Sequence, residues 1–136
     1  MYRMVKGKIN PEEITALVRG KESGACITFI GTVRDKSRGR EVRYLEYDAY
    51  DSMAEREMES IGNEIRKRWK VSNVAIVHRR GKCEIGEVAI VIAISAEHRE
   101  DAFKGCWFAI ERIKREVPIW KKEYYADGEA WIGSKA

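Results

Sequence analysis

Residues 95–123 decide the fold, and they read SAEHREDAFKGCWFAIERIKREVPIWKKE. Apolar residues recur at helical spacing over 99–117, which is typical of a helix that packs one face against a sheet. Pro118 ends this helix, because proline disfavours the helical conformation of the residue before it. The flanking segments 88–94 and 120–125 have the composition of strands. The stretch therefore predicts a strand, a long helix and a second strand.

One lysine of this helix lies among apolar positions. At about 100° per residue, one stripe collects the apolar residues Phe103, Cys106, Trp107, Ile110, Ile113 and Val117. Lys114 falls on that stripe, whereas Phe108 falls on the polar side and is a candidate interface residue. Two interpretations of Lys114 stay open. The lysine can snorkel to water, or it can point into a cleft, where burial and neighbouring cations would lower its pKa and make it an acid, base or nucleophile.

The other elements of the sequence are consistent with one domain covering residues 1–136. Two helices are predicted to begin after capping residues: one after Asn10, which is followed by Pro11 and two acids, and one after Asp51. Strands are predicted at 5–9, 25–33, 42–50, 74–77, 88–94, 120–125 and 130–132. The segment 88–94 is apolar on both faces and should lie at the centre of its sheet. This order predicts the α+β class, with three helices against a mainly antiparallel sheet.

Charge and composition limit the classes of function. The chain has 26 basic and 22 acidic residues, a net charge of +4 and a pI of about 9.0. This mild excess favours anionic ligands without requiring nucleic acid. No apolar run approaches the roughly 18 residues of a membrane span, and no hydrophobic signal segment is visible near the first residues. We therefore expect a cytoplasmic protein that binds neither membranes nor nucleic acids.

The cysteines give no sign of a metal or redox centre. Cys26, Cys83 and Cys106 are widely spaced and match no zinc or paired-cysteine motif. Cys26 and Cys106 lie in apolar segments and are predicted to be small core residues. Cys83 lies in a predicted turn, where its thiol would be open to solvent.

Cations gather where strands meet helices. His98 and Arg99 mark the start of the long helix, where free N–H groups and the helix dipole favour an anion. Arg99 would strengthen such a site with a charge-assisted fork. Arg34 closes another strand and is a third candidate. The sequence leaves open whether the three converge within one chain or across a dimer.

Two neighbouring lysines follow Pro118. Successive side chains of extended chain point to opposite faces, so only one of Lys121 and Lys122 can share a cleft with Lys114. A histidine at the end of another strand, His78, is interpreted as structural.

Four segments in series resemble the large, catalytic subunit of molybdopterin synthase, the MoaE family. They are Phe29–Arg34 (FIGTVR), Val77–Gly81 (VHRRG), Ser95–Arg99 (SAEHR) and Pro118–Glu123 (PIWKKE), with Trp131 beyond them. Each motif alone is weak, but four in matching order, covering roughly residues 25–131, are specific to this family.

The resemblance implies an α/β-hammerhead fold and a homodimer of large subunits. A small ubiquitin-like subunit would dock at each end to give a heterotetramer, and its C-terminal Gly-Gly thiocarboxylate would thread into the large subunit. The implied activity is a sulfurtransferase that adds two sulfurs to cyclic pyranopterin monophosphate (precursor Z), forming the dithiolene of molybdopterin during molybdenum cofactor biosynthesis. The resemblance implies no metal and no bound organic cofactor.

Site residues follow from the same resemblance. Lys114 and Lys121 match the two essential lysines and would be catalytic. Arg34, His98 and Arg99, together with Lys121, would bind the substrate. The chain departs from the family in two places: Glu97 stands where alanine is frequent, and Lys135 is the nearest equivalent of an arginine that completes a neighbouring subunit's site.

Two alternatives from other classes remain. A cysteine-persulfide sulfurtransferase would use Cys83, which has Lys82 as an adjacent cation. A small nucleic-acid-binding module would use the basic segment 34–40, although no aromatic platform of a known type accompanies it.

Overall fold

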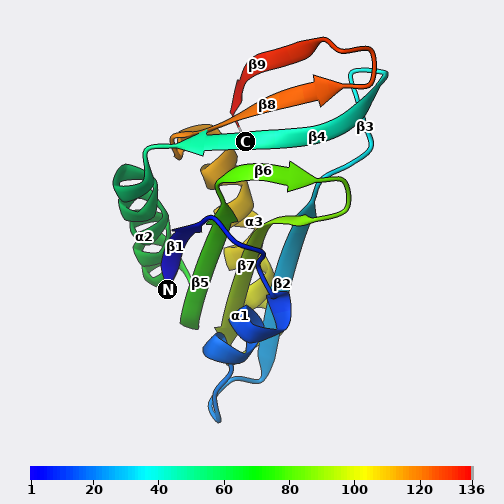
Figure 1. The fold of residues 1–136 in the computed structure, drawn as a ribbon. Helices are drawn as coiled ribbons and strands as arrows, with labels where there is room; N and C mark the ends of the chain where they lie inside the picture. The colour runs from blue at the N-terminus through cyan, green and yellow to red at the C-terminus, as the bar shows by residue number, and fades with distance from the viewer. Residues whose placement is uncertain (136) are drawn as a thin grey trace.

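The computed structural model describes residues 1–135, with side chains as far as Trp131. Figure 1 shows two sheets, with the second lying across one end of the first. The elements are β1 (Tyr2–Val5), α1 (Pro11–Val18), β2 (Ala25–Thr32), β3 (Lys36–Ser37), β4 (Arg40–Ala49), α2 (Asp51–Arg68), β5 (Val71–Arg79), β6 (Gly81–Glu84), β7 (Val88–Ala96), α3 (Arg99–Glu116), β8 (Ile119–Tyr125) and β9 (Ala130–Lys135). The architecture confirms the predicted α+β class and three helices.

The first sheet has the strand order β1-β5-β7-β2, and β7 is central as predicted. Strand alternation gives each face of the sheet its own hydrophobic cluster. Ala75 and Val91 face α1, whereas Ile76 and Ile92 belong to the larger cluster that α2 and α3 cover. The near-continuous apolar sequence of β5 and β7 thus reflects burial on both sides.

Local signals explain α1 and α2. The side-chain oxygen of Asn10 accepts a hydrogen bond from the backbone N–H of Glu12 at 3.1 Å, so it caps α1 as predicted. Asp51, the predicted cap of α2, is instead the first residue of that helix, and Tyr50 occupies the cap position without a side-chain hydrogen bond. The carboxylate of Asp51 pairs with Arg80 at 3.1 Å, which ties the start of α2 to the end of β5.

The predicted buried face of α3 is partly wrong. The buried residues on this helix are Ala102, Gly105, Cys106, Ala109 and Ile113. Phe103 and Trp107 were predicted to face the core, yet both are exposed. Small residues explain the rotation, because they let the helix backbone approach the sheet closely: a Cβ at Gly105 would lie 3.1 Å from the Ile65 side chain. Phe108 packs edge-on against Trp69, between α2 and α3.

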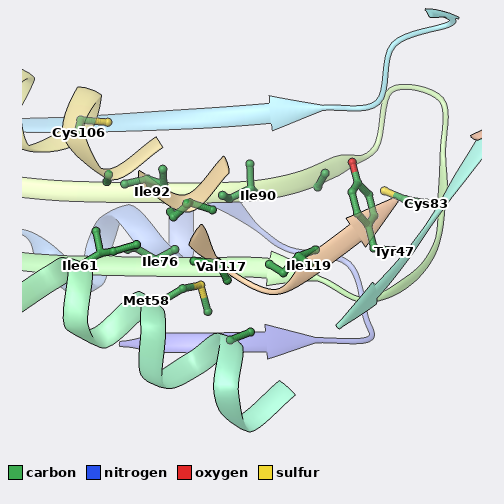
Figure 2. Close-up of a cluster of buried hydrophobic side chains, with 14 of the residues drawn as sticks. Tyr47, Met58, Ile61, Ile76, Cys83, Ile90, Ile92, Cys106, Val117 and Ile119 are labelled. Carbon is green, nitrogen blue, oxygen red and sulfur yellow. The ribbon is translucent and has the colours of Figure 1, made fainter. Parts of the chain in front are cut away.

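The second sheet joins β3, β4, β8 and β9, and β6 also pairs with β4. Its inner face continues the larger hydrophobic cluster through Leu45, Ile119 and Tyr125. Figure 2 shows this cluster from Met58 and Ile61 on α2 to Tyr47 and Cys83 at the other end. The two sheets and α3 therefore share one core.

Three strand predictions need correction. The first strand is Tyr2–Val5, parallel to β5, and not 5–9. The basic segment 34–40, which lies between two predicted strands, contains a further strand, β3, which forms a tight hairpin with β4. The predicted turn after β5 contains β6. Short strands such as these depend on pairing across the fold and leave little periodicity in the sequence.

The chain just before β2 packs closely against the end of β7, and this contact can be tested by substitution. A Cβ at Gly24 would lie 2.3 Å from the backbone carbonyl oxygen of Glu97, and no side-chain movement can relieve that contact. We expect Gly24→Ala to lower the free energy of unfolding by about 1–3 kcal/mol, measured by urea denaturation. Gly7→Ala is the control, because nothing lies within 4 Å of its added Cβ. Equal stability of both variants would contradict this close contact between Gly24 and Glu97.

Candidate functional site

A cavity of about 250 Å³ lies where α3 meets both sheets. The end of β2 and the start of β7 form its floor, the C-terminal half of α3 forms one wall, and β4 and β8 form another. Its lining residues are Phe29, Gly31, Thr32, Arg34, Lys36, Ser37, Leu45, Tyr47, His78, Ala89, Ile90, Ile110, Ile113, Lys114, Lys121 and Glu123. The apolar members belong to the core or its edge, so the polar members stand on a rigid base.

Four cationic side chains from separate elements line this cavity. Lys114 comes from the last turn of α3, Lys121 from β8, Arg34 from the chain just after β2, and Lys36 from β3. Burial lowers the pKa of the Lys121 ammonium. The charge of Glu123 opposes this shift, and the charges of Lys114 and Arg34 add to it. The cavity is therefore suited to an anionic ligand, and it holds an ammonium that gives up its proton more readily than an exposed lysine does.

The two neighbouring lysines on β8 have different surroundings. Lys121 lines the cavity. The ammonium of Lys122 lies 4.8 Å from the centre of the Tyr124 ring, and a hydrogen bond with that residue raises its pKa. The strand alternation thus separates the two side chains, and it places Lys121 with Lys114.

Glu123 is a buried carboxylate in the same cavity. The Tyr125 hydroxyl donates to it at 3.0 Å, and the Arg38 guanidinium lies 3.6 Å away. Burial alone would raise the pKa of the Glu123 carboxyl, but hydrogen bonds from Ser37 and Tyr125 and the charges of Lys121 and Arg38 lower it below its usual range. The site therefore contains one fixed negative charge among its cations.

His78 also lines the cavity, although it was interpreted only as a structural residue. Its Nδ1 lies 2.7 Å from the carbonyl oxygen of Arg79, so Nδ1–H donates and Nε2 carries the free lone pair. Its ring meets Tyr47 edge-on, with ring centres 4.9 Å apart. Burial lowers the pKa of His78 to about 4; the hydrogen bond to Arg79 opposes this shift and the charge of Lys114 adds to it. His78 is therefore neutral at pH 7.

His98 and Arg99 lie at the opposite end of α3 from Lys114. A rise of about 1.5 Å per residue puts Arg99 roughly 22 Å from Lys114 along the helix. Arg34 is also distant from them, because it follows β2 where β7 begins, whereas His98 follows β7 where it ends. Within one chain, the structure brings Arg34, Lys114 and Lys121 to one cavity and keeps His98 and Arg99 away from it.

Glu97, the residue that departs from the family pattern, contacts a lysine and the neighbouring histidine. Its carboxylate pairs with Lys70 at 3.1 Å and lies 3.7 Å from Nε2 of His98, whose side chain is 74% exposed. A hydrogen bond from Lys70 and the charges of Lys70 and His98 lower the pKa of Glu97. The side chain of Lys135 lies outside the described residues.

The structure weakens both alternative functions. Cys83 was expected in an open turn, but it is fully buried in the core, and burial raises the pKa of its thiol. A reactive thiol needs the opposite conditions. In the basic hairpin, Arg40 pairs with Asp127 and Glu129, and Arg38 stacks on Trp131 at 4.2 Å. Because these arginines contact other side chains of the protein, the hairpin has fewer cations available to bind the phosphates of a nucleic acid.

Tyr47, His78 and Glu123 line the cavity, although none of them was predicted from the sequence as a site residue. Glu123 had a signal, because it lies two residues after Lys121 and therefore shares its face of the strand. Tyr47 is directly opposite Lys121 in the β4–β8 ladder. That pairing joins residues 74 positions apart, and no local pattern reports it.

The part of the chain that the structure describes offers neither a metal site nor a membrane-spanning helix. Among the described residues, no three His, Cys, Asp or Glu side chains are grouped as a metal site would need. None of the described helices has a stretch long and apolar enough to cross a bilayer.

Known proteins resemble the whole chain. Residues 4–116 match the model of the family described as MoaE protein. The molybdopterin synthase catalytic subunit of Halalkalibacterium halodurans is 53% identical over 98% of this chain and 86% of that protein. The Bacillus subtilis catalytic subunit is 48% identical over 98% and 85%.

Solved structures agree with this likeness. The crystal structure of molybdopterin synthase from Staphylococcus aureus superposes with a TM-score of 0.92 and 40% identity, covering 98% of this chain and 96% of that one. A complex of subunits 1 and 2 of molybdopterin-converting factor from Helicobacter pylori shares the fold, with a TM-score of 0.79 and 20% identity over 96% and 88%.

The buried neutral His78 predicts a pH dependence of stability. Its pKa is lower in the folded protein than in the unfolded chain, so only the unfolded chain gains a proton between pH 6.5 and about 4. The stability that depends on a neutral His78 is complete above pH 6.5 and is lost as the pH falls toward 4. We expect the difference in unfolding free energy between wild type and His78→Gln to shrink by about 3 kcal/mol over that range.

Urea denaturation at a series of pH values measures this difference. His98→Ala is the matched control, because His98 is the other histidine of the chain and is exposed. The comparison separates the effect of burying a histidine ring from the effect of losing a histidine side chain. A constant difference for His78→Gln would show that its buried ring does not resist protonation.

Proposed function

Because the chain belongs to the MoaE protein family, we propose that it is the catalytic subunit of a molybdopterin synthase and acts as a sulfurtransferase in molybdenum cofactor biosynthesis. Its substrate is cyclic pyranopterin monophosphate, to which two sulfurs are added in turn while the cyclic phosphate opens. The sulfur arrives as the thiocarboxylate at the C-terminus of a small ubiquitin-like subunit. Relatives that carry the catalytic-subunit name at 53% and 48% identity support this assignment.

One observation carries the proposal: Lys114 and Lys121 come from different elements and line the same cavity, with Arg34 beside them. A cyclic phosphate needs fixed cations, and these three supply them. A core wall of Phe29, Ile90 and Ile113 gives an apolar surface for a flat ring. A cavity built in this way fits a ring that bears a phosphate.

The two lysines have chemistry suited to sulfur transfer. When a thiocarboxylate attacks carbon, departing oxygens need protons and the acyl oxygen needs a stabilising charge. The lowered pKa of Lys121 favours proton donation near neutral pH. In this proposal Lys114 and Lys121 together serve as acid, base and stabiliser of the oxyanion, and no single role is assigned to either lysine.

The proposal also includes partners and a location. The C-terminal tail of the small subunit would enter the cavity as an extended, glycine-ended chain. In the Helicobacter pylori complex the two subunits of molybdopterin-converting factor were solved together.

Three free cysteines suit the reducing cytoplasm, where we place the protein.

His98 and Arg99 join this site only through a second copy of the chain. They lie roughly 22 Å from Lys114 along α3, a distance no side chain spans. In a homodimer with two-fold symmetry, each copy can give its His98 and Arg99 to the other's cavity. The two residues then bind the anionic part of a substrate held by Arg34 and Lys121.

Replacing either catalytic lysine tests the function. We expect Lys114→Ala and Lys121→Ala each to lower the rate of dithiolene formation by about 10²–10⁴, measured with a thiocarboxylated small subunit and precursor Z. Both variants should fold and still bind the small subunit. Lys122→Ala is the matched control, because its ammonium lies against Tyr124, and it should keep near-normal activity. Near-normal rates in both lysine variants would overturn the mechanism.

Mixing two inactive variants tests whether the site is shared. One chain carries Lys114→Ala, and the other carries His98→Ala with Arg99→Ala. If sites form across a dimer, a mixed dimer contains one intact site, and unfolding and refolding the chains together should restore up to about a quarter of wild-type activity. If His98 and Arg99 served their own chain, no intact site would form and no activity would return.

A further inference from the structure

Two neutral polar side chains, Tyr47 and His78, lie next to each other in the wall of the cavity. Tyr47 is 8% exposed and His78 is 3% exposed, so both are more than nine-tenths buried. Both nevertheless line the cavity, and their rings meet edge-on with centres 4.9 Å apart. Tyr47 on β4 lies directly opposite Gly81, the first residue of β6, and β6 follows closely on the end of β5 that carries His78. Strand pairing therefore holds the two side chains together.

Each of these side chains has a hydrogen-bonding atom without a partner in the part of the chain that the structure describes. The imidazole of His78 donates from Nδ1 to the Arg79 carbonyl oxygen at 2.7 Å, and its Nε2 keeps a free lone pair. The hydroxyl of Tyr47 likewise meets no donor or acceptor of the described residues. Unlike the hydroxyl of Ser95, which is sealed inside the core, both atoms are accessible from the cavity. A buried polar group without a partner costs free energy, so each atom calls for a ligand.

The surroundings fix which of the two atoms donates and which accepts. The buried guanidinium of Arg79 pairs with Glu87 at 3.3 Å, which steadies the backbone carbonyl that Nδ1–H binds. Burial keeps the histidine neutral, because it lowers the pKa of the ring. Burial also raises the pKa of the Tyr47 hydroxyl, and the nearby Cys83 and Glu123 add to that shift. At pH 7 the wall therefore presents one acceptor, Nε2, beside one donor, the hydroxyl.

A neutral acceptor beside a neutral donor is poorly suited to a phosphate. The oxygens of a cyclic phosphate accept hydrogen bonds, so the lone pair of His78 would repel them. Arg34, Lys114 and Lys121 already supply the charge that a phosphate needs. The pair instead complements an uncharged amide, whose N–H donates to Nε2 and whose C=O accepts from the Tyr47 hydroxyl. The pyrimidine ring of a pterin contains such a group, and so does the last peptide of the small subunit's tail.

We propose that Tyr47 and His78 form a neutral subsite of the cavity, which binds an uncharged amide group and selects among anionic ligands that the cations alone would not distinguish. The inference rests on the proposed function for the identity of the ligands, and it extends that function to the part of a ligand that carries no charge. A ligand without N–H beside C=O leaves both buried groups unpaired, and that cost disfavours its binding. The two residues bind, and they take no part in the proton transfers assigned to the lysines.

Isothermal titration calorimetry tests the subsite by binding alone. One arm titrates precursor Z into the chain, and the other titrates a small subunit that ends in an ordinary carboxylate. Tyr47→Phe removes one oxygen and keeps the ring, so it should raise the dissociation constant of the ligand that supplies the amide about threefold to tenfold. Weakening confined to precursor Z assigns the amide to the pterin, and weakening confined to the small subunit assigns it to the tail.

Tyr44→Phe is the matched control for this experiment. Tyr44 stacks on Tyr124 and does not line the cavity, so the loss of its hydroxyl should leave both dissociation constants unchanged. Unchanged constants for Tyr47→Phe in both arms would overturn the subsite. If the unaltered chain bound neither ligand, the proposed function itself would fail, so the two failures have different signatures.

Two substitutions of His78 separate ligand binding from a purely structural role. The amide of His78→Asn can replace Nδ1 as the donor to the Arg79 carbonyl, but it has no atom at the position of Nε2. The longer side chain of His78→Gln can place an amide oxygen where Nε2 accepts. We expect His78→Asn to weaken binding as much as Tyr47→Phe does, and His78→Gln to restore most of the affinity. Equal affinity of the two His78 variants, both shown to be folded by circular dichroism, would overturn the assignment of Nε2.

Discussion

The close packing of α3 on the first sheet is the constraint on which the rest of the structure depends. Ala102, Gly105 and Ala109 are fully buried, or nearly so, and leave no room for larger side chains. This contact sets the rotation of the helix about its axis. The rotation in turn directs Ile113 inward, carries Lys114 to the cavity mouth and leaves Phe103 and Trp107 in solvent. The placement of the site and the shape of the outer surface are thus two results of one contact.

The electrostatics of the site depend equally on one strand. Alternation along β8 places Lys121 and Glu123 on the face that meets the core, and Lys122 on the other. Glu123 offsets part of the positive charge that would otherwise gather in a confined space. Its hydrogen bond from Tyr125 and its ion pair with Arg38 hold it in place, so the compensation is structural and does not depend on a ligand. The cavity therefore stays positively charged, but Glu123 reduces the repulsion between its cations.

Much of this fold could be predicted from local sequence, because long elements carry strong periodicity. The cap at Asn10, the central position of β7 and the separation of Lys121 from Lys122 all follow from spacing alone. The buried face of α3 could not be predicted, because alanine and glycine count for little in a hydrophobic pattern, yet they decide how closely a helix approaches. The contribution of Tyr47 and His78 to the cavity depends on strand pairing across the chain. The separation of His98 from Lys114 follows from helix length, but only the fold shows that Arg34 lies with Lys114 and far from His98.

The burial of Cys83 has a consequence for chemical selectivity. Cys83 lies beside Tyr47, whose ring forms part of the cavity wall, and burial keeps its thiol protonated and sealed from solvent. Cys106 has a raised pKa for the same reason. Once the thiocarboxylate sulfur has attacked carbon, the small subunit is joined to its substrate through a thioester. A nearby thiolate would attack the carbonyl carbon of that thioester, expel the substrate's sulfur as a thiolate and leave the small subunit trapped on the protein as a new thioester. A protein that passes sulfur from one partner to another therefore gains fidelity by keeping the thiols of Cys83 and Cys106 buried and protonated.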